Sequence, residues 1–309
     1  MRFVLSLTLA LTAAGCLAHH RGPLPGEPAG ARFVTENGVR VRVRDVGKGP
    51  AVLLLHGFAS ALETWTTVTP ELERNHRVIS LDLKGFGWTD RPEGDYSPMA
   101  QAALVRGVLD QLGVKEFDLI AHSWGSSVAL ALALQAPERV QKIALYDAWV
   151  FEDQLPSFFR WAKVGGVGEA LFALFYKQRP GDRISAAFYN PDLVSEAFVE
   201  EIEHALERPG TSAAALAAVR GQNFAELEPK WPSIKNRTLL LWGREDAVTW
   251  LEFGERLQNL LPNAELKVYP HCGHFPMLEA RAESNRDLLQ FLGNPAAAAL
   301  GTPAEGVRP

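Results

Sequence analysis

Apolar and polar positions alternate along the chain in short runs that predict a series of strands. Residues 33–35 and 39–46 alternate in polarity around Asn37-Gly38, a pair that favours a two-residue hairpin turn. The runs at 51–56 and 77–81 are short and largely apolar, which is typical of buried strands, and further runs predict strands as well. These runs cover residues 51–56, 77–81, 117–121, 142–146, 238–242 and 265–269.

Segments with helical periodicity separate these runs. They cover residues 99–112, 124–135, 249–261 and 276–292. Buried strands that alternate with helices predict an α/β fold, with a mostly parallel central sheet and helices on both faces. We expect the core of this fold to span residues 31–147 and 237–294.

Residues 148–236 interrupt the alternation, because they contain helical stretches and no convincing strand. Aromatic side chains are frequent there. Phe172, Phe175 and Tyr176 recur at helical spacing, which is typical of residues that pack within a core. Binding crevices of open α/β sheets lie at the carboxyl ends of the strands. We therefore predict that this insertion is a helical cap over that edge of the sheet.

The two ends of the chain lack the pattern of the core. Residues 1–15 combine an early arginine, a short apolar run and small residues, which predicts a signal peptide. We expect lipidation of Cys16, which follows Ala-Gly; ordinary cleavage after Ala18 is the alternative. Residues 16–30 predict a flexible tether and residues 295–309 a disordered tail. The chain is thus expected to be exported to the cell envelope with a lipid anchor, or otherwise to be periplasmic or secreted.

Composition and charge narrow the class of partner. The 309 residues are 47% hydrophobic and 22% charged, which is ordinary for a globular enzyme with a large buried core. The net charge of -5 and the absence of a Lys/Arg-rich stretch argue against a nucleic-acid partner. Cys16 and Cys272 form no disulfide framework. His271, Cys272 and His274 lack further nearby ligands, so no metal site is expected.

A serine lies where a predicted strand meets a predicted helix. In the segment AHSWG, residues 121–125, small residues suit a tight turn that exposes Ser123 as a nucleophile. Ala121 stands where such turns usually have glycine. The backbone N–H of Trp124 would lie at the start of the helix, where it can bind an oxyanion. A serine that only caps the helix is the alternative.

Other strand ends provide the expected partners of this serine. Phe58 follows the strand at 51–56, so its backbone N–H is the expected second oxyanion donor. Asp246 and His274 each follow a later strand. Because the carboxyl ends of parallel strands share one edge, His274 can act as general base and Asp246 as the acid that orients it. His271 is the alternative base and Asp147 the alternative acid.

Taken together, these blocks resemble the α/β-hydrolase fold superfamily from about residue 33 to residue 292. The resemblance is carried by HGF, DLKGFGWTDRP, AHSWGS, WGREDAV and PHCGHFPMLE, which occur in the order found in that family. It implies Ser123, Asp246 and His274 as a catalytic triad. It also implies Phe58 and Trp124 as the residues whose backbone N–H groups form the oxyanion hole.

The resemblance implies a serine hydrolase that needs no cofactor. We expect a small-molecule substrate, a carboxylic ester of small to medium apolar groups, that is cleaved through an acyl-enzyme on Ser123. Relatives with the same triad that hydrolyse carbon–carbon bonds of diketones, or that act as cofactor-free perhydrolases, provide the alternative. A non-catalytic binding module is a further alternative, which the complete set of three residues opposes.

Overall fold

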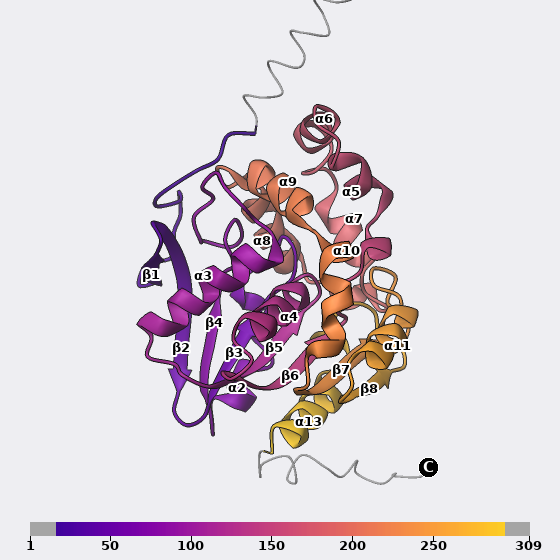
Figure 1. The fold of residues 1–309 in the computed structure, drawn as a ribbon. Helices are drawn as coiled ribbons and strands as arrows, with labels where there is room; N and C mark the ends of the chain where they lie inside the picture. Colours follow the sequence, from indigo (N-terminus) through magenta and orange to yellow (C-terminus); the bar gives the residue numbers. More distant parts are fainter. Residues whose placement is uncertain (1–16, 294–309) are drawn as a thin grey trace, which may run out of the picture.

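An eight-stranded sheet runs through residues 17–293, the part of the chain that the computed structural model describes (Figure 1). Its strands are β1 (Arg32–Glu36), β2 (Val39–Gly47), β3 (Ala51–Leu55), β4 (Arg77–Leu81), β5 (Phe117–His122), β6 (Val140–Tyr146), β7 (Arg237–Gly243) and β8 (Ala264–Tyr269). They lie in the order β1-β2-β4-β3-β5-β6-β7-β8. Only the β1–β2 and β2–β4 pairs are antiparallel. This arrangement confirms the predicted α/β fold with a mostly parallel sheet.

The predicted hairpin joins β1 to β2. Glu36 pairs with Val39, so the turn consists of Asn37 and Gly38 alone. Their φ angles are 48° and 74°, as a two-residue turn with two left-handed residues requires.

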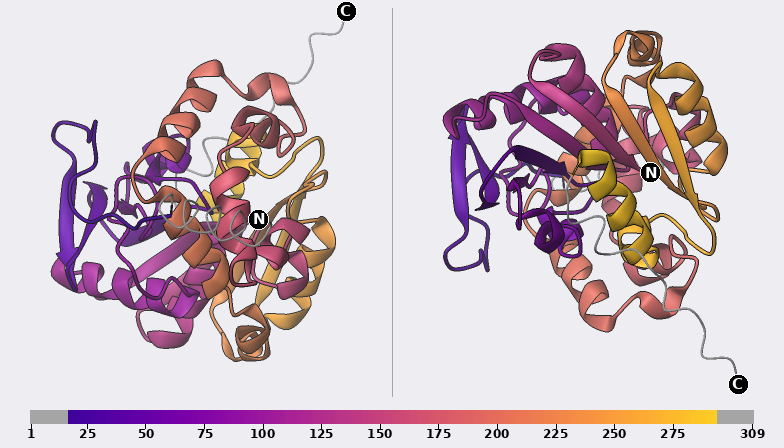
Figure 2. Two further views of the ribbon diagram at one scale, coloured as in Figure 1. Left: turned by 90° about the horizontal axis from the view of Figure 1, so that it is seen from above. Right: turned by 90° about the horizontal axis from the view of Figure 1, so that it is seen from below.

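Helices cover both faces of the sheet (Figure 2). Along β3, Leu53 and Leu55 join the hydrophobic cluster on one face, while Val52 and Leu54 join the cluster on the other. This alternation follows from the two-residue period of a strand. The first face packs against α3 (Pro98–Gln111), α4 (Gly125–Gln135) and α11 (Leu251–Leu260). The second packs against η1 (Leu62–Trp65), α2 (Thr69–Leu72), α12 (Pro276–Glu279) and α13 (Arg281–Leu292).

Residues 148–236, here called the helical insertion, lie between β6 and β7 and contain no strand. The helices are η2 (Glu152–Gln154), α5 (Ser157–Ala162), α6 (Val167–Leu174), α7 (Pro180–Ser185), η3 (Pro191–Leu193), α8 (Glu196–Glu207), α9 (Thr211–Gly221), α10 (Phe224–Leu227) and η4 (Glu228–Ser233). Figure 1 shows α5 to α9 gathered above one end of the sheet. Phe172 and Tyr176 are buried, whereas Phe175 is half-exposed. Within residues 17–293 no helix has the length and apolar content needed to cross a membrane.

The structure differs from the flexible tether predicted for residues 16–30. His20 N–H donates to Arg91 O over 2.9 Å, and Arg91 N–H donates back to His20 O over 3.0 Å. Leu24 is only 4% exposed. Pro and Gly remove helical periodicity but leave an extended chain that can still pair with another segment and bury a leucine. The predicted signal peptide, Cys16 and the tail at 295–309 lie outside the described residues.

Packing of this segment predicts that it contributes to stability. We expect Leu24→Ala to lower the free energy of unfolding by about 2 kcal/mol, because it removes a buried side chain. Urea unfolding measures the change. The matched control is Leu193→Ala, since Leu193 is 52% exposed. Equal, small effects of both variants would show that residues 17–30 do not pack on the fold.

Candidate active site

Ser123 occupies a tight turn between β5 and α4. Its φ of 51° lies in the left-handed region, which is strained for a residue with a Cβ. Ser123 N–H donates to Tyr146 O over 2.9 Å, and Ser123 O accepts from Trp149 N–H over 3.1 Å. Gly125 lets the helix start close to β3, because a Cβ there would lie 2.3 Å from His56 O. These contacts hold Ser123 at the carboxyl end of β5.

The structure brings Ser123, His274 and Asp246 into one hydrogen-bonded line. His274 Nε2 lies 2.9 Å from Ser123 Oγ, and His274 Nδ1 lies 2.8 Å from Asp246 Oδ2. In the same order, the three residues are 4%, 5% and 4% exposed. A base within hydrogen-bond reach of a hydroxyl, and itself oriented by a carboxylate, is the arrangement that activates a serine. The alternative base, His271, is exposed, and its Nδ1 lies 3.1 Å from the Tyr189 hydroxyl.

Donors from one short loop hold the carboxylate of Asp246. Oδ1 accepts from the N–H groups of Val248 (2.7 Å) and Thr249 (3.0 Å), and Oδ2 accepts from the Thr249 hydroxyl (2.7 Å). Burial opposes ionisation, but the adjacent His274 ring and the bonds from Thr249 outweigh it and lower the pKa of Asp246. Asp246 is therefore the ionised acid of the line. Sequence reasoning missed Thr249, although the spacing Asp-x-x-Thr after a strand is a signal for such a loop.

Asp147, the alternative acid, is fully buried beside Asp246 at the end of β6. Its Oδ1 accepts from Gly243 N–H over 2.9 Å. Burial, and next the Asp246 carboxylate, raise the pKa of Asp147 well above its ordinary value. These two effects favour the neutral form of Asp147, whereas the charged form is favoured at Asp246 next to His274.

His122 holds the backbone of His274. His122 Nε2 lies 2.8 Å from His274 O, and since a carbonyl only accepts, Nε2 carries the proton. Burial lowers the pKa of His122 to about 3, so the ring is neutral. His122 therefore anchors the backbone of His274, a contact that the sequence pattern did not reveal.

The loop after β3 and the start of α4 meet at Ser123. A Cβ on Gly57 would lie 3.0 Å from the Cβ of Ser123, so the backbone passes very close to the serine. Within residues 17–293 neither Phe58 N–H nor Trp124 N–H donates a backbone hydrogen bond outside helices and strands. Both groups are thus free to bind an oxyanion, as the predicted roles of Phe58 and Trp124 require.

Aromatic rings surround Phe58 on the side of the helical insertion. The Phe58 ring centroid lies 5.3 Å from that of Phe86 and 6.2 Å from that of Trp124 in the core. It also lies 5.1 Å from Phe159 and 6.4 Å from Tyr176, which belong to the insertion. The surroundings of the site are therefore apolar and are shared between core and insertion.

Three residues at this site carry side chains of types that can bind a metal ion. Ligand atoms of His122, Asp147 and His274 lie within 4.8 Å of one another. Both ring nitrogens of His274 are already hydrogen bonded, to Ser123 and Asp246, and His122 Nε2 donates to a carbonyl. The arrangement therefore favours proton transfer over metal binding.

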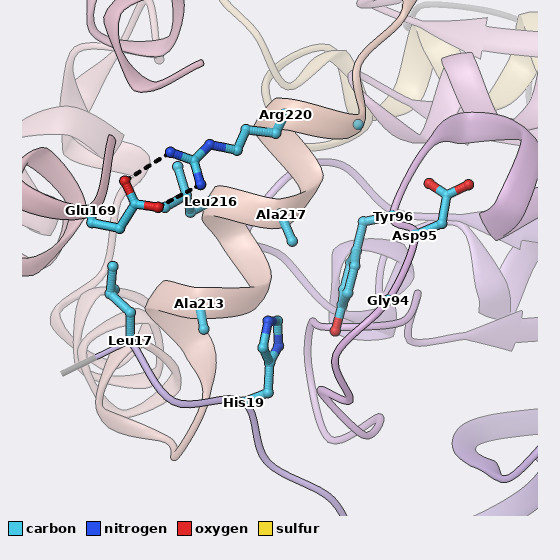
Figure 3. Close-up of a pocket in the computed structure, with 11 residues that line it drawn as sticks. Leu17, His19, Gly94, Asp95, Tyr96, Glu169, Ala213, Leu216, Ala217 and Arg220 are labelled. Atoms are coloured by element: carbon cyan, nitrogen blue, oxygen red, sulfur yellow. Dashed lines mark hydrogen bonds and ion pairs between the residues drawn. The ribbon is translucent and has the colours of Figure 1, made fainter. Parts of the chain in front are cut away.

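A separate hollow of about 510 Å³ lies between α9, residues 94–96 and the segment at residues 17–19 (Figure 3). The ion pair between Arg220 and Glu169, 2.7 Å apart, lies at one side of it. Its lining includes neither Ser123 nor His274, so the hydrogen-bonded line and this hollow are different places.

A family model and the curated relatives of this chain both indicate a hydrolase family. A model described as the alpha/beta hydrolase fold matches residues 50–281. A 2-hydroxy-6-oxo-2,4-heptadienoate hydrolase from Pseudomonas putida is 31% identical over 287 residues, which cover 85% of this chain and 95% of the relative.

Two solved structures are similar over nearly their whole length. A meta-cleavage product hydrolase from Pseudomonas fluorescens has a TM-score of 0.75 and 26% identity, and the match covers 85% of this chain and 97% of that one. An enzyme described as degrading N-acyl homoserine lactones has a TM-score of 0.71 and 26% identity, over 84% of this chain and 100% of that one.

The relatives contradict the predicted location in the cell envelope. Three curated relatives that match 85%, 88% and 87% of the chain are named as hydrolases of small oxo-dienoates or a semialdehyde, and none of these names indicates export or a lipid anchor. The predicted export signal and the anchor at Cys16 depend on residues 1–16 alone, which lie outside the described residues.

The raised pKa of Asp147 predicts a pH-dependent effect of Asp147→Asn. The unfolded carboxyl titrates near pH 4, whereas the folded one stays protonated to higher pH. The native state thus binds more protons, so wild-type stability falls as pH rises from about 4 through the folded pKa. The amide cannot titrate. The variant should therefore gain stability relative to wild type with rising pH, by at most about 1.4 kcal/mol per pH unit.

Urea unfolding of both proteins at several pH values from 5 to 8 tests this trend. Asp192→Asn, at an exposed position, is the matched control and should show no such trend. A constant difference between Asp147→Asn and wild type over this range would show that Asp147 is ionised throughout.

Proposed function

Because the chain belongs to the α/β-hydrolase fold family, we propose that it is a hydrolase that cleaves a carbon–carbon bond beside a ketone in a small oxo-dienoate. One observation carries the proposal: His274 Nε2 lies 2.9 Å from Ser123 Oγ in a chain whose relatives are named as hydrolases of this substrate class. In this proposal Ser123 is the nucleophile, His274 the base and Asp246 the acid that orients it.

The first step forms a bond between serine and the ketone. His274 Nε2 takes the proton of Ser123 Oγ while Oγ attacks the carbonyl carbon. The ionised Asp246 stabilises the His274 imidazolium that results, across the 2.8 Å contact at Nδ1. The carbonyl oxygen becomes an oxyanion, for which the free N–H groups of Phe58 and Trp124 are the donors. Loss of one such donor costs about 10²- to 10³-fold in rate in other enzymes.

The second step breaks the carbon–carbon bond. For this to occur, the enol of the substrate first becomes a ketone, and the proton that its hydroxyl gives up is added to the carbon beside the ketone that Ser123 attacks. When the bond breaks, that carbon takes the electron pair, which is delocalised through the alkene onto the new 2-oxo group, and His274 returns its proton to that fragment. Ser123 is left as an acyl ester. Water, deprotonated by His274, then releases the acyl group as a carboxylic acid and restores Ser123.

The helical insertion acts as the cap in this proposal. It lies between strands whose carboxyl ends carry the site, and it places Phe159 and Tyr176 against Phe58. Aromatic walls bind the apolar or conjugated part of a substrate and exclude water from the oxyanion, which strengthens the two N–H bonds to it.

Ester hydrolysis is the second candidate. A chain of similar structure is described as degrading N-acyl homoserine lactones, which are cyclic esters. The same serine, base and donors would act on an ester, and an alkoxide leaves more easily than a carbon fragment. The apolar rings around Phe58 suit an apolar acyl group equally well.

Labelling with a fluorophosphonate probe tests the nucleophile. We expect Ser123→Ala to abolish labelling and to lower kcat by about 10⁶-fold on whichever substrate is turned over. Ser126→Ala is the matched control, because the Ser126 hydroxyl is buried without a partner among the described residues, and this variant should label like wild type. Labelling that persists in Ser123→Ala would overturn the assignment.

A direct comparison of two substrates separates the candidates. We expect kcat/KM for 2-hydroxy-6-oxo-hepta-2,4-dienoate, followed by the loss of its absorbance, to exceed that for p-nitrophenyl butyrate by at least about tenfold. The reverse ranking, with the dienoate unchanged after long incubation, would show that the protein hydrolyses esters rather than carbon–carbon bonds.

A further inference from the structure

The helical insertion contacts the loop of His274 through one short segment, residues 187–190. Ala187 O accepts a hydrogen bond from His274 N–H over 2.8 Å. The ring of Phe188 stacks on that of Phe275, with centroids 4.7 Å apart. The insertion therefore touches both the base itself and the residue that follows it.

Glu279, the last residue of α12, hydrogen bonds to both sides of this contact. Its Oε2 accepts from the N–H groups of Tyr189 (2.8 Å) and Asn190 (3.2 Å) in the insertion. Its Oε1 accepts from Gly273 N–H over 2.9 Å in the histidine loop. Burial raises the pKa of Glu279, while these backbone N–H donors oppose that shift by stabilising the charged form. One carboxylate thus joins the insertion to the residue directly before His274.

The two backbones approach each other too closely for a side chain at residue 273. A Cβ on Gly273 would lie 2.4 Å from Ala187 O and 2.7 Å from Tyr189 N. On its other side, His274 O accepts from His122. Both backbone polar groups of His274 are therefore occupied, the N–H by the insertion and the carbonyl by the residue before Ser123.

We propose that Glu279 is a positioning residue that keeps His274 within reach of Ser123 by locking residues 187–190 onto the histidine loop. This proposal rests on the proposed function, because it takes His274 as the base. If residues 187–190 move away, His274 N–H loses its acceptor, Ala187 O. The N–H groups of Tyr189 and Asn190 then lose their acceptor, Glu279 Oε2. Of the two backbone hydrogen bonds of His274 described above, the one to His122 then remains. Closure of the insertion over a substrate and assembly of the catalytic line are thereby a single event.

Glu279→Gln tests this coupling with little change of shape. The glutamine amide keeps one acceptor oxygen. Its NH₂ group faces a backbone N–H that donates to the carboxylate in the wild type, so one hydrogen bond is lost. We expect the second-order rate of fluorophosphonate labelling at Ser123 to fall about 10- to 100-fold, because a displacement of about 1 Å at a catalytic group has that effect. Glu255→Gln, at an exposed position of α11, is the matched control and should label like wild type.

Gly273→Ala provides an independent route to the same displacement. Its methyl group would wedge Ala187 O away without altering Glu279. We expect a similar loss of labelling. The double variant with Glu279→Gln should label no more slowly than the slower single variant, since both substitutions break the same contact between residues 187–190 and the histidine loop. Hydrogen–deuterium exchange should show faster exchange in residues 187–190 and 271–274 together.

The outcomes separate this proposal from the proposed function. Wild-type rates in folded Glu279→Gln overturn the positioning role. Wild-type protein that is folded but never labels overturns the proposed function instead. In that case hydrogen–deuterium exchange tests the positioning role of Glu279 without activity. Faster exchange of residues 187–190 and 271–274 in Glu279→Gln supports that role, and unchanged exchange of residues 271–274 overturns it.

Discussion

The hydrogen bond between Ser123 Oγ and His274 Nε2 depends on three loops that meet at one edge of a parallel sheet. Ser123 follows β5, Asp246 follows β7 and His274 follows β8. Parallel strands end on the same side, so residues far apart in the sequence become neighbours once the strands pair in register. The order β3-β5-β6-β7-β8 sets these distances. The 2.9 Å contact therefore depends on the positions of β5 and β8, which are separated by β6 and β7 in the sheet.

Burial also determines which of the groups around this contact carry a charge. A buried charge is costly unless it is paired and hydrogen bonded, and the site solves this by leaving one carboxylate charged. Asp246 receives two backbone N–H groups, the Thr249 hydroxyl and His274. Burial and the charge of Asp246 raise the pKa of Asp147 beside it, which favours the neutral form of Asp147. Burial lowers the pKa of His122 and keeps that ring neutral. Proton transfer between Ser123 and His274 is thus the one charge-forming step that the surroundings support.

Sequence patterns predicted the framework because it depends on local rules. Continuous apolar runs marked the buried strands, and Asn37-Gly38 marked the hairpin. Strand ends also indicated where Ser123, Asp246 and His274 would lie. Contacts between distant segments have no such signal. The pairing of His20 with Arg91, the carboxylate of Glu279 under residues 187–190 and the neutral state of Asp147 arise only when the fold brings their partners together.

The central claim is that Ser123 and His274 act as one unit, and a double-variant comparison tests it most directly. Rates would be measured on one substrate for Ser123→Ala, for His274→Ala and for the protein with both substitutions. The account predicts that the double variant is no slower than the single ones, because either change already removes the activated serine. Losses that multiply in the double variant would contradict it, since they would show that the two residues contribute through separate interactions.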